Sequence, residues 1–228
     1  MQVVILAGGK GMRLRPITKL VPKPMVPILG KPFLQYQLEF ARSLGLKRFL
    51  FLTGYLGDQI KKYFGDGKKF GVKIDYSREK KLLGTAGALR NAAPKLDKEF
   101  LLLNGDTFLP IDYNKLIKYF KQCGRVGMVS VYDNAKKIVA NNIAVDKSGL
   151  VIKYDKEDHK GMVCVDSGAV VFKKEVLSLV PAGEFCSLEN DVFGKLIEKK
   201  ELMVFTNSQR FYDMGSFQGL KVLKDKLK

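Results

Sequence analysis

Histidine is almost missing from this sequence of 228 residues. The single histidine, His159, lies in a charged stretch, so neither a Ser-His-Asp triad nor a histidine zinc site is available. Cysteine is also scarce: three are scattered along the chain without a CxxC pair, which argues against a disulfide framework and fits a reducing compartment.

Long apolar runs are missing as well. No segment approaches the ~20 residues that a membrane-spanning helix needs, and the initial VVILAGG is too short for a secretory signal. With 46% hydrophobic and 28% charged residues, the chain can bury a full core without disulfides or a structural metal. We expect a cytoplasmic protein with no membrane partner. The sequence is compatible with a homo-oligomer but does not determine the oligomeric state.

Acidic residues are few, with 23 against 40 lysines and arginines and a formal net charge of +17. Such an excess is typical of nucleic-acid-binding proteins, but it also arises from solvated lysines. The lysine pairs here are spread evenly along the chain and lack interleaved aromatic residues. We therefore predict no nucleic-acid partner and treat most of the charge as solvated.

The order of apolar and amphipathic segments predicts an α/β fold. Strands are expected at 2–7, 47–53, 72–77, 99–103 and 126–132, with helices at 33–44, 57–64, 85–93 and 113–122. The second half predicts a hairpin over 141–154, strands at 163–172 and 202–206, and helices at 173–179, 188–199 and 216–227. Alternating strands and helices at this spacing indicate a three-layer domain with a mixed, mostly parallel sheet.

The loop after the first strand, residues 8–24, is rich in glycine, proline and cations. Gly8, Gly9 and Gly11 let backbone amides approach a ligand, and the first acid of the chain is Glu39. Backbone donors with converging cations suit a polyphosphate. The loop is not a P-loop, because Gly30-Lys31 is followed by proline, and it lacks the third glycine of a dinucleotide fingerprint.

Two other segments fall where ligands of open α/β sheets bind. Asp106 follows an apolar strand in Asn-Gly-Asp and predicts a metal ligand, or alternatively a turn cap. Asp213, in RFYDMGS, is the candidate for a second carboxylate. The small residues of LLGTAGAL, 82–89, would let a flat group such as a nucleobase lie against the backbone, although they also suit close helix packing.

These motifs together resemble a known family. LAGGKGMRLRPITKLVPKPM is similar to the signature of the sugar-1-phosphate nucleotidyltransferases, and LLGTAGAL, LLLNGD and FYDMGS resemble their later motifs in order. The resemblance implies a Rossmann-like nucleotide-binding core at about 1–135 and a smaller sugar-binding lobe at about 136–228, within one domain. It also implies Mg²⁺, an NTP and a sugar 1-phosphate as cofactor and substrates, and release of pyrophosphate.

The resemblance assigns roles to individual positions. Arg13 would hold the β- and γ-phosphates, Lys23 would contact the α-phosphate as the second catalytic residue, and Asp106 and Asp213 would bind the metal. The expected nucleotide-binding residues are Leu6, Ala7, Gly8, Gly9, Gly11, Met12, Arg13, Lys23, Glu79, Gly84, Thr85 and Asp106. The expected sugar-phosphate-binding residues are Asn104, Gly105, Asn142, Asp155, Lys156, Asp166 and Ser167. Asp155, Asp166 and Ser167 depart from the family's usual residues.

The substrate pair is inferred from one more segment. FCSLENDVF, 185–193, resembles a segment of short bacterial members that make GDP-heptose or GDP-mannose. The resemblance favours GTP and D-glycero-D-manno-heptose 1-phosphate, a step toward a cell-surface polysaccharide. Mannose-1-phosphate guanylyl, uridylyl, thymidylyl and cytidylyl transfer remain alternatives. A non-catalytic nucleotide-sensing subunit and a nucleic-acid binder are alternatives of another class.

Overall fold

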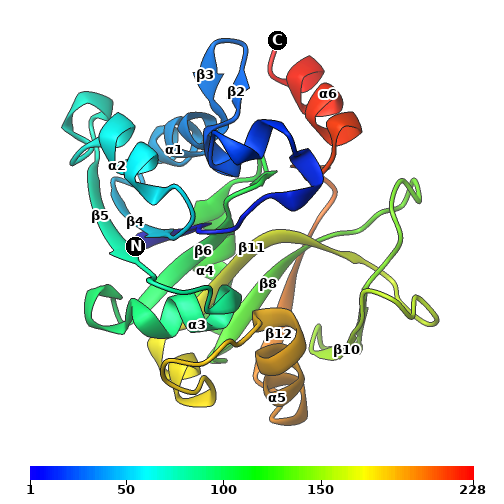
Figure 1. The fold of residues 1–228 in the computed structure, drawn as a ribbon. Coiled ribbons are helices and arrows are strands. Elements are labelled where there is room, and N and C mark those ends of the chain that lie inside the picture. Colours follow the sequence, from blue (N-terminus) through cyan, green and yellow to red (C-terminus); the bar gives the residue numbers. More distant parts are fainter.

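A seven-stranded sheet runs through the centre of the computed structural model, which describes residues 1–228 (Figure 1). From edge to edge its strands are β12 (Leu202–Asn207), β8 (Gly127–Tyr132), β11 (Val165–Lys173), β6 (Glu99–Asn104), β1 (Gln2–Ala7), β4 (Arg48–Thr53) and β5 (Lys73–Arg78). The sheet is mixed and mostly parallel, as predicted, because β11 alone runs opposite to its neighbours β6 and β8.

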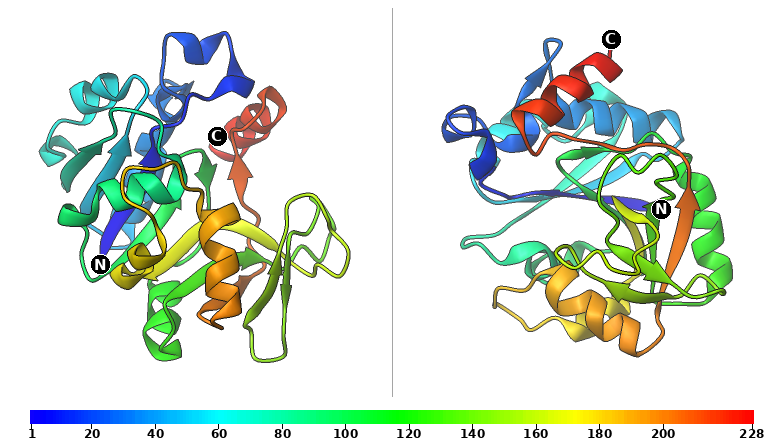
Figure 2. Two further views of the ribbon diagram at one scale, coloured as in Figure 1. Left: turned by 60° about the horizontal axis from the view of Figure 1, so that its bottom comes forward. Right: turned by 90° about the vertical axis from the view of Figure 1, so that its right-hand side faces the viewer.

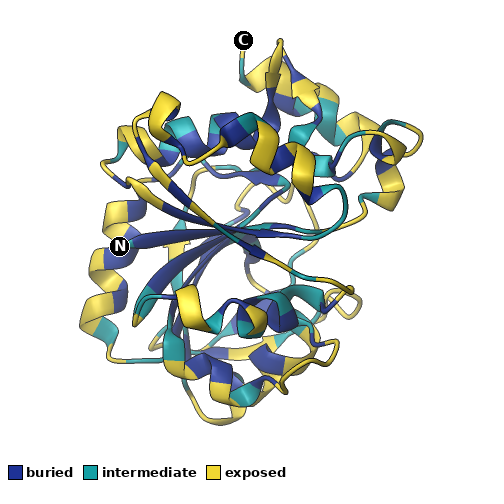
Figure 3. Ribbon diagram, turned by 60° about the vertical axis from the view of Figure 1, so that its left-hand side comes forward, coloured by how far each residue is buried: buried dark blue, intermediate teal, exposed yellow.

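Both faces of this sheet are buried, which explains why its strands read as continuous apolar runs. Val3 and Ile5 of β1 face one core, whereas Val4 faces the other. Helices α1 (Phe33–Ser43), α2 (Gly57–Phe64) and α4 (Tyr113–Cys123) cover the first face, and α3 (Gly84–Asn91) and α5 (Phe193–Glu198) cover the second. Figure 3 shows the buried strands between two helical layers. The three-layer prediction is confirmed.

Three predicted segments of the second half take a different or more precise form. The hairpin consists of β9 (Ile143–Val145) and β10 (Val151–Tyr154) and projects beside the sheet (Figure 1). Residues 174–179 form a 3-10 helix, and the helix predicted at 188–199 is divided into a π-turn, 188–192, and α5. The side chain of Thr85 accepts the N–H of Leu188 at 2.7 Å, a tertiary contact at the start of the π-turn that the local sequence does not reveal.

The loop after β1 is more ordered than its composition indicates. It contains three 3-10 turns, at 12–14, 17–19 and 23–25, and leads into the small hairpin of β2 (Pro27–Ile28) and β3 (Lys31–Pro32). Gly11 adopts a φ of 60°, and a β-carbon there would lie 3.0 Å from the side chains of Lys23 and Thr18. Glycine at this position therefore allows the loop to close on itself.

A third, smaller core fixes this loop to the end of the chain. It joins buried side chains of the loop and the β2–β3 hairpin to β7 (Thr107–Phe108), to the residue after β13 (Tyr212–Asp213) and to α6 (Phe217–Lys226). Its buried members are Leu14, Val26, Ile28, Phe33, Phe108, Met214 and Leu223. Figure 2 shows α6 (red) beside the loop (blue). None of the helices has both the length and the apolar character that a membrane span requires.

Candidate active site

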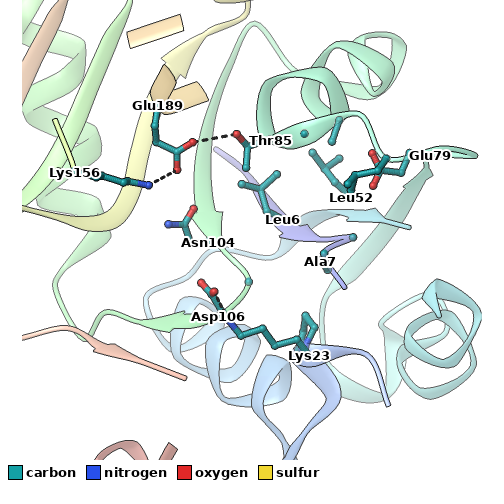
Figure 4. A pocket seen from close by; sticks show the side chains of 17 residues that line it. Leu6, Ala7, Lys23, Leu52, Glu79, Thr85, Asn104, Asp106, Lys156 and Glu189 are labelled. Atoms are coloured by element: carbon teal, nitrogen blue, oxygen red, sulfur yellow. Dashed lines mark hydrogen bonds and ion pairs between the residues drawn. The ribbon is translucent and has the colours of Figure 1, made fainter. Parts of the chain in front are cut away.

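A cleft of about 330 Å³ opens at the carboxyl ends of β1, β4 and β6 (Figure 4). Its volume lies in the range of small-molecule sites, and its position is where open α/β sheets bind ligands. The predicted site residues that line it are Leu6, Ala7, Gly8, Gly9, Lys23, Glu79, Gly84, Thr85, Asn104, Gly105, Asp106 and Lys156. Segments far apart in the sequence therefore meet in one cavity.

Lys23 and Asp106 form an ion pair at one end of the cleft (Figure 4). The Nζ of Lys23 donates to Oδ2 of Asp106, and the lysine side chain is only 12% exposed between Pro22 and Pro24. Oδ1 of Asp106 accepts the hydroxyl of Thr107 at 3.2 Å. A nearly buried ammonium group therefore faces the cleft from a stiff segment of the chain.

The turn that carries Asp106 is held by two close contacts. Gln37 of α1 donates through Nε2 to the carbonyls of Asn104 and Thr107, at 2.8 and 2.7 Å. A β-carbon at Gly105 would collide with the carbonyl oxygen of Leu6. The backbone of the Asn-Gly-Asp turn is therefore pressed against β1 and anchored from α1, so Asp106 starts from a fixed position.

Arg13 lies in a second recess that adjoins the cleft. Gly9, Lys23 and Asp106 belong to both cavities, and the recess is completed by Gly11, Met12, Arg13 and Gly215. A β-carbon at Gly215 would lie 2.9 Å from Nη2 of Arg13. A ligand that extends from the cleft past Lys23 would therefore enter the recess of Arg13.

Asp106 and Asp213 are the two carboxylates that could hold a metal ion. Asp213 is paired with Thr107 across the β7–β13 ribbon, and Met214 N–H donates to the carbonyl of Asp106 at 2.9 Å, so the two residues are neighbours. The chain has no cluster of three or more His, Cys, Asp and Glu suited to a metal. Two carboxylates completed by substrate phosphates and water are a ligand set that Mg²⁺ prefers. The chemistry of the two carboxylates therefore suits that ion, although Asp213 lines neither the cleft nor the recess of Arg13.

Glu79 lines the cleft on the side away from Lys156 and Glu189 (Figure 4). Its Oε2 accepts the N–H of Leu83 at 3.0 Å, whereas Oε1 has no protein donor. Burial raises the pKa of Glu79 above its ordinary value, although the bond from Leu83 opposes the rise. A β-carbon at Gly8 would lie 2.9 Å from this Oε1, so a flat ligand resting on the glycines would meet a carboxylate at its edge.

Lys156 approaches the cleft from the second half of the chain. Its Nζ lies 3.3 Å from Oε1 of Glu189, whose other oxygen accepts the hydroxyl of Thr85 at 3.2 Å (Figure 4). Glu189 lines the cleft although the sequence did not single it out as a site residue. It lies within the FCSLENDVF segment, which was the only sequence signal for it.

The other residues expected to bind the sugar phosphate do not line the cleft. Asp166 is half-buried, accepts the hydroxyl of Tyr154 at 3.1 Å and donates its N–H to Oδ1 of Asn142 at 2.9 Å. Burial raises the pKa of Asp166. Ser167 donates to the carbonyl of Ser130 at 2.8 Å, and Asp155 accepts the N–H groups of its own turn. These side chains are engaged within the protein.

The chain is similar to known proteins over most of its length. The protein-family model described as Nucleotidyl transferase matches residues 2–228. The chain is 36% identical over 179 residues to the D-glycero-alpha-D-manno-heptose 1-phosphate guanylyltransferase of Campylobacter jejuni, covering 78% of each chain. It is 31% identical over 215 residues to the UTP–glucose-1-phosphate uridylyltransferase of Synechocystis, covering 87% of this chain and 55% of that relative. It therefore spans about half the length of the latter enzyme.

A solved structure is similar over the full length. The crystal structure of HddC from Yersinia pseudotuberculosis complexed with GMP-PN superimposes with a TM-score of 0.84 at 28% identity, covering 100% of this chain and 99% of the other. The α/β fold predicted from the sequence therefore matches that of an experimentally determined relative.

Proposed function

The chain belongs to the nucleotidyl transferase family, and from this premise we propose that it transfers a nucleotidyl group from an NTP to a sugar 1-phosphate. The observation that carries the proposal is the position of the Lys23–Asp106 pair, where the cleft meets the recess of Arg13. A triphosphate lying across this junction would place its α-phosphate at Lys23 and its β- and γ-phosphates toward Arg13.

The reaction needs no histidine base, because a sugar 1-phosphate is already an anionic nucleophile at neutral pH. One of its phosphate oxygens attacks the α-phosphorus, and the bond to the β-phosphate breaks to release pyrophosphate. Lys23 would stabilise the charge that develops at the α-phosphate, and Arg13 would bind the leaving pyrophosphate. Catalysis then consists of alignment and charge neutralisation, which lysine and arginine can supply.

Members of this family generally use a divalent metal, and we propose Mg²⁺ held by Asp106 and Asp213. When bound, the ion would neutralise phosphate charge and help to hold the triphosphate in line. Lys23 now occupies one oxygen of Asp106. We therefore propose that Lys23 turns from Asp106 to the α-phosphate when the metal and the nucleotide arrive.

We propose GTP and D-glycero-D-manno-heptose 1-phosphate as the substrates. Two heptose 1-phosphate guanylyltransferases among the relatives support this pair, from Campylobacter jejuni at 36% and Aneurinibacillus thermoaerophilus at 29% identity. A mannose-1-phosphate guanylyltransferase of Mycobacterium tuberculosis at 29% identity keeps mannose 1-phosphate as the second candidate. We place the enzyme in the cytoplasm, which agrees with its three free cysteines.

The carboxylate of Glu79 supports guanine as the base. Guanine presents two neighbouring donors, N1–H and the N2 amino group, to a carboxylate acceptor, whereas uracil presents one N–H between two carbonyls. Oε1 of Glu79 has no protein donor and lies at the edge of the cleft, so it is available for such a base.

Replacing Glu79 by glutamine is expected to lower kcat/KM for GTP by roughly 10-fold to 100-fold, the scale of one good base-recognition contact. Glutamine has one acceptor oxygen and an amino group that repels the guanine donors. The measurement is pyrophosphate release with GTP and UTP as competing substrates. Glu99→Gln serves as the control, because Glu99 begins β6 and does not line the cleft. An unchanged GTP/UTP preference would refute the role of Glu79.

A matrix of four NTPs against several sugar 1-phosphates, read by pyrophosphate release with and without Mg²⁺, tests the proposed function. We expect the highest turnover with GTP and the heptose phosphate, and none after chelation of the metal. A folded protein that releases pyrophosphate with no pair contradicts the proposal. Steeply salt-dependent binding of DNA or RNA would instead favour the nucleic-acid alternative.

A further inference from the structure

Glu189 joins the two sides of the cleft through its two carboxylate oxygens. Oε2 accepts the hydroxyls of Thr85 at 3.2 Å and Ser187 at 3.0 Å, and Oε1 lies 3.3 Å from Nζ of Lys156. Thr85 belongs to α3 on the nucleotide side, whereas Lys156 follows β10 on the sugar side (Figure 4). The carboxylate is therefore the direct link between the helix beside the base and the cation of the opposite wall.

Glu189 and Lys156 differ in how firmly their side chains are held. The side chain of Glu189 is 18% exposed, whereas that of Lys156 is 56% exposed. Two hydroxyl donors fix the glutamate, and Thr85 also accepts the N–H of Leu188 at 2.7 Å, which fixes the turn itself. Lys156 has four rotatable bonds and no other ion-pair partner. The glutamate is the fixed member of the pair, and the lysine is the member that it orders.

The charge of Glu189 is maintained in spite of its position. Burial alone would raise the pKa of this carboxyl, but the positive charge of Lys156 and the hydrogen bonds from Ser187 and its own backbone outweigh burial, so the pKa lies below its ordinary value. Asp166 is a further carboxyl near Lys156, and burial raises its pKa. Glu189 is the carboxylate that forms the ion pair with Lys156.

We propose that Glu189 is a positioning residue that acts on the sugar 1-phosphate through Lys156. It holds the ammonium group at the wall of the cleft before the substrate arrives. The lysine side chain therefore loses less conformational entropy when it binds the phosphate. Because the same carboxylate is hydrogen-bonded to Thr85, the position of the Lys156 side chain also depends on the position of α3. The inference rests on the proposed function, since it assigns Lys156 to the phosphate of the acceptor.

Glu189→Gln is expected to raise the KM for the sugar 1-phosphate roughly tenfold, with kcat and the KM for the NTP changed less than twofold. Glutamine keeps an acceptor for Thr85 and Ser187 but loses the charge that holds Lys156. Glu157→Gln removes an exposed acid next to Lys156 that contacts no cation, so it should leave the KM unchanged. An increase that also occurs in this control would overturn the proposal.

A double-mutant cycle distinguishes positioning from direct contact. In a Lys156→Met background, Glu189→Gln should cause no further rise in the KM for the sugar phosphate, because the side chain that it orders is gone. If Glu189→Gln raised the KM for the sugar phosphate by the same factor in both backgrounds, Glu189 would contact the substrate or support the fold. That result would overturn the proposal. Thermal unfolding of all four proteins checks the fold.

Amine labelling gives a readout that does not depend on turnover. The acylation rate of Lys156, measured by mass spectrometry, should rise several-fold in Glu189→Gln and stay constant in Glu157→Gln, because only Glu189 forms an ion pair with the amine of Lys156. Unchanged labelling overturns the inference while the proposed function stands. If the wild-type protein releases no pyrophosphate in the substrate matrix, the proposed function fails, and the role toward the sugar phosphate fails with it.

Discussion

Lys23→Ala is expected to lower kcat by roughly 10²–10³-fold, the scale of removing one donor that stabilises transition-state charge. The KM for the NTP should change far less, because in the proposed mode of binding Arg13 and the backbone of the glycine loop would still face the triphosphate. Lys23 is the only cation that lines both the cleft and the recess of Arg13. No other side chain is therefore placed to replace it at the α-phosphate.

The measurement is steady-state pyrophosphate release at saturating NTP and sugar phosphate. Lys62→Ala, an exposed lysine of α2 without an ion pair, is the matched control and should retain full activity. Because Lys23 also neutralises Asp106, thermal unfolding must show that the variant is folded. A folded Lys23→Ala enzyme with wild-type turnover would refute the role given to this lysine.

Asp106→Asn is the second substitution with a large expected effect. We expect kcat to fall by roughly 10²–10³-fold and the Mg²⁺ concentration at half-maximal rate to rise, since a neutral amide is a poorer ligand for the ion. Asparagine keeps the size of the side chain, and the turn remains anchored by Gln37. The fold should therefore survive.

Activity measured over a series of Mg²⁺ concentrations checks this expectation. Asp213→Asn should change the metal requirement in the same direction, because Asp213 is paired with Thr107, the residue next to Asp106. Asp75→Asn, an exposed aspartate of β5, should leave it unchanged. If Asp106→Asn retained both the wild-type rate and the wild-type metal requirement, Asp106 would not be a metal ligand.

The fold could be predicted where local pattern determines it. The strands of the first half are continuous apolar runs because α1, α2 and α4 cover one face and α3 and α5 the other, and their bounds agree with the prediction within two residues. The reversed direction of β11 was not predictable in the same way. An apolar run carries no information on its direction, which depends on the path of the chain between strands.

The site could be predicted where one motif carries the contacts. The glycines after β1 and the Asn-Gly-Asp turn after β6 line the cleft because they follow strands directly, and Lys23 belongs to the same motif as the glycines. Glu189 was missed because it enters through a five-residue π-turn that is held by Thr85, more than a hundred positions away. The contacts of Asn142, Asp166 and Ser167 depend on the irregular pairing of β11 with β8, which the local sequence does not specify.

The small core that joins the loop to α6 has a consequence for heat inactivation. Seven buried residues support the recess of Arg13, whereas two cores of 25 buried residues each support the sheet. Less buried apolar surface means less resistance to local opening. On warming, the loop and α6 should therefore come apart together while the sheet is still intact. Binding of the proposed triphosphate substrate would therefore be lost at a lower temperature than the fold of the sheet.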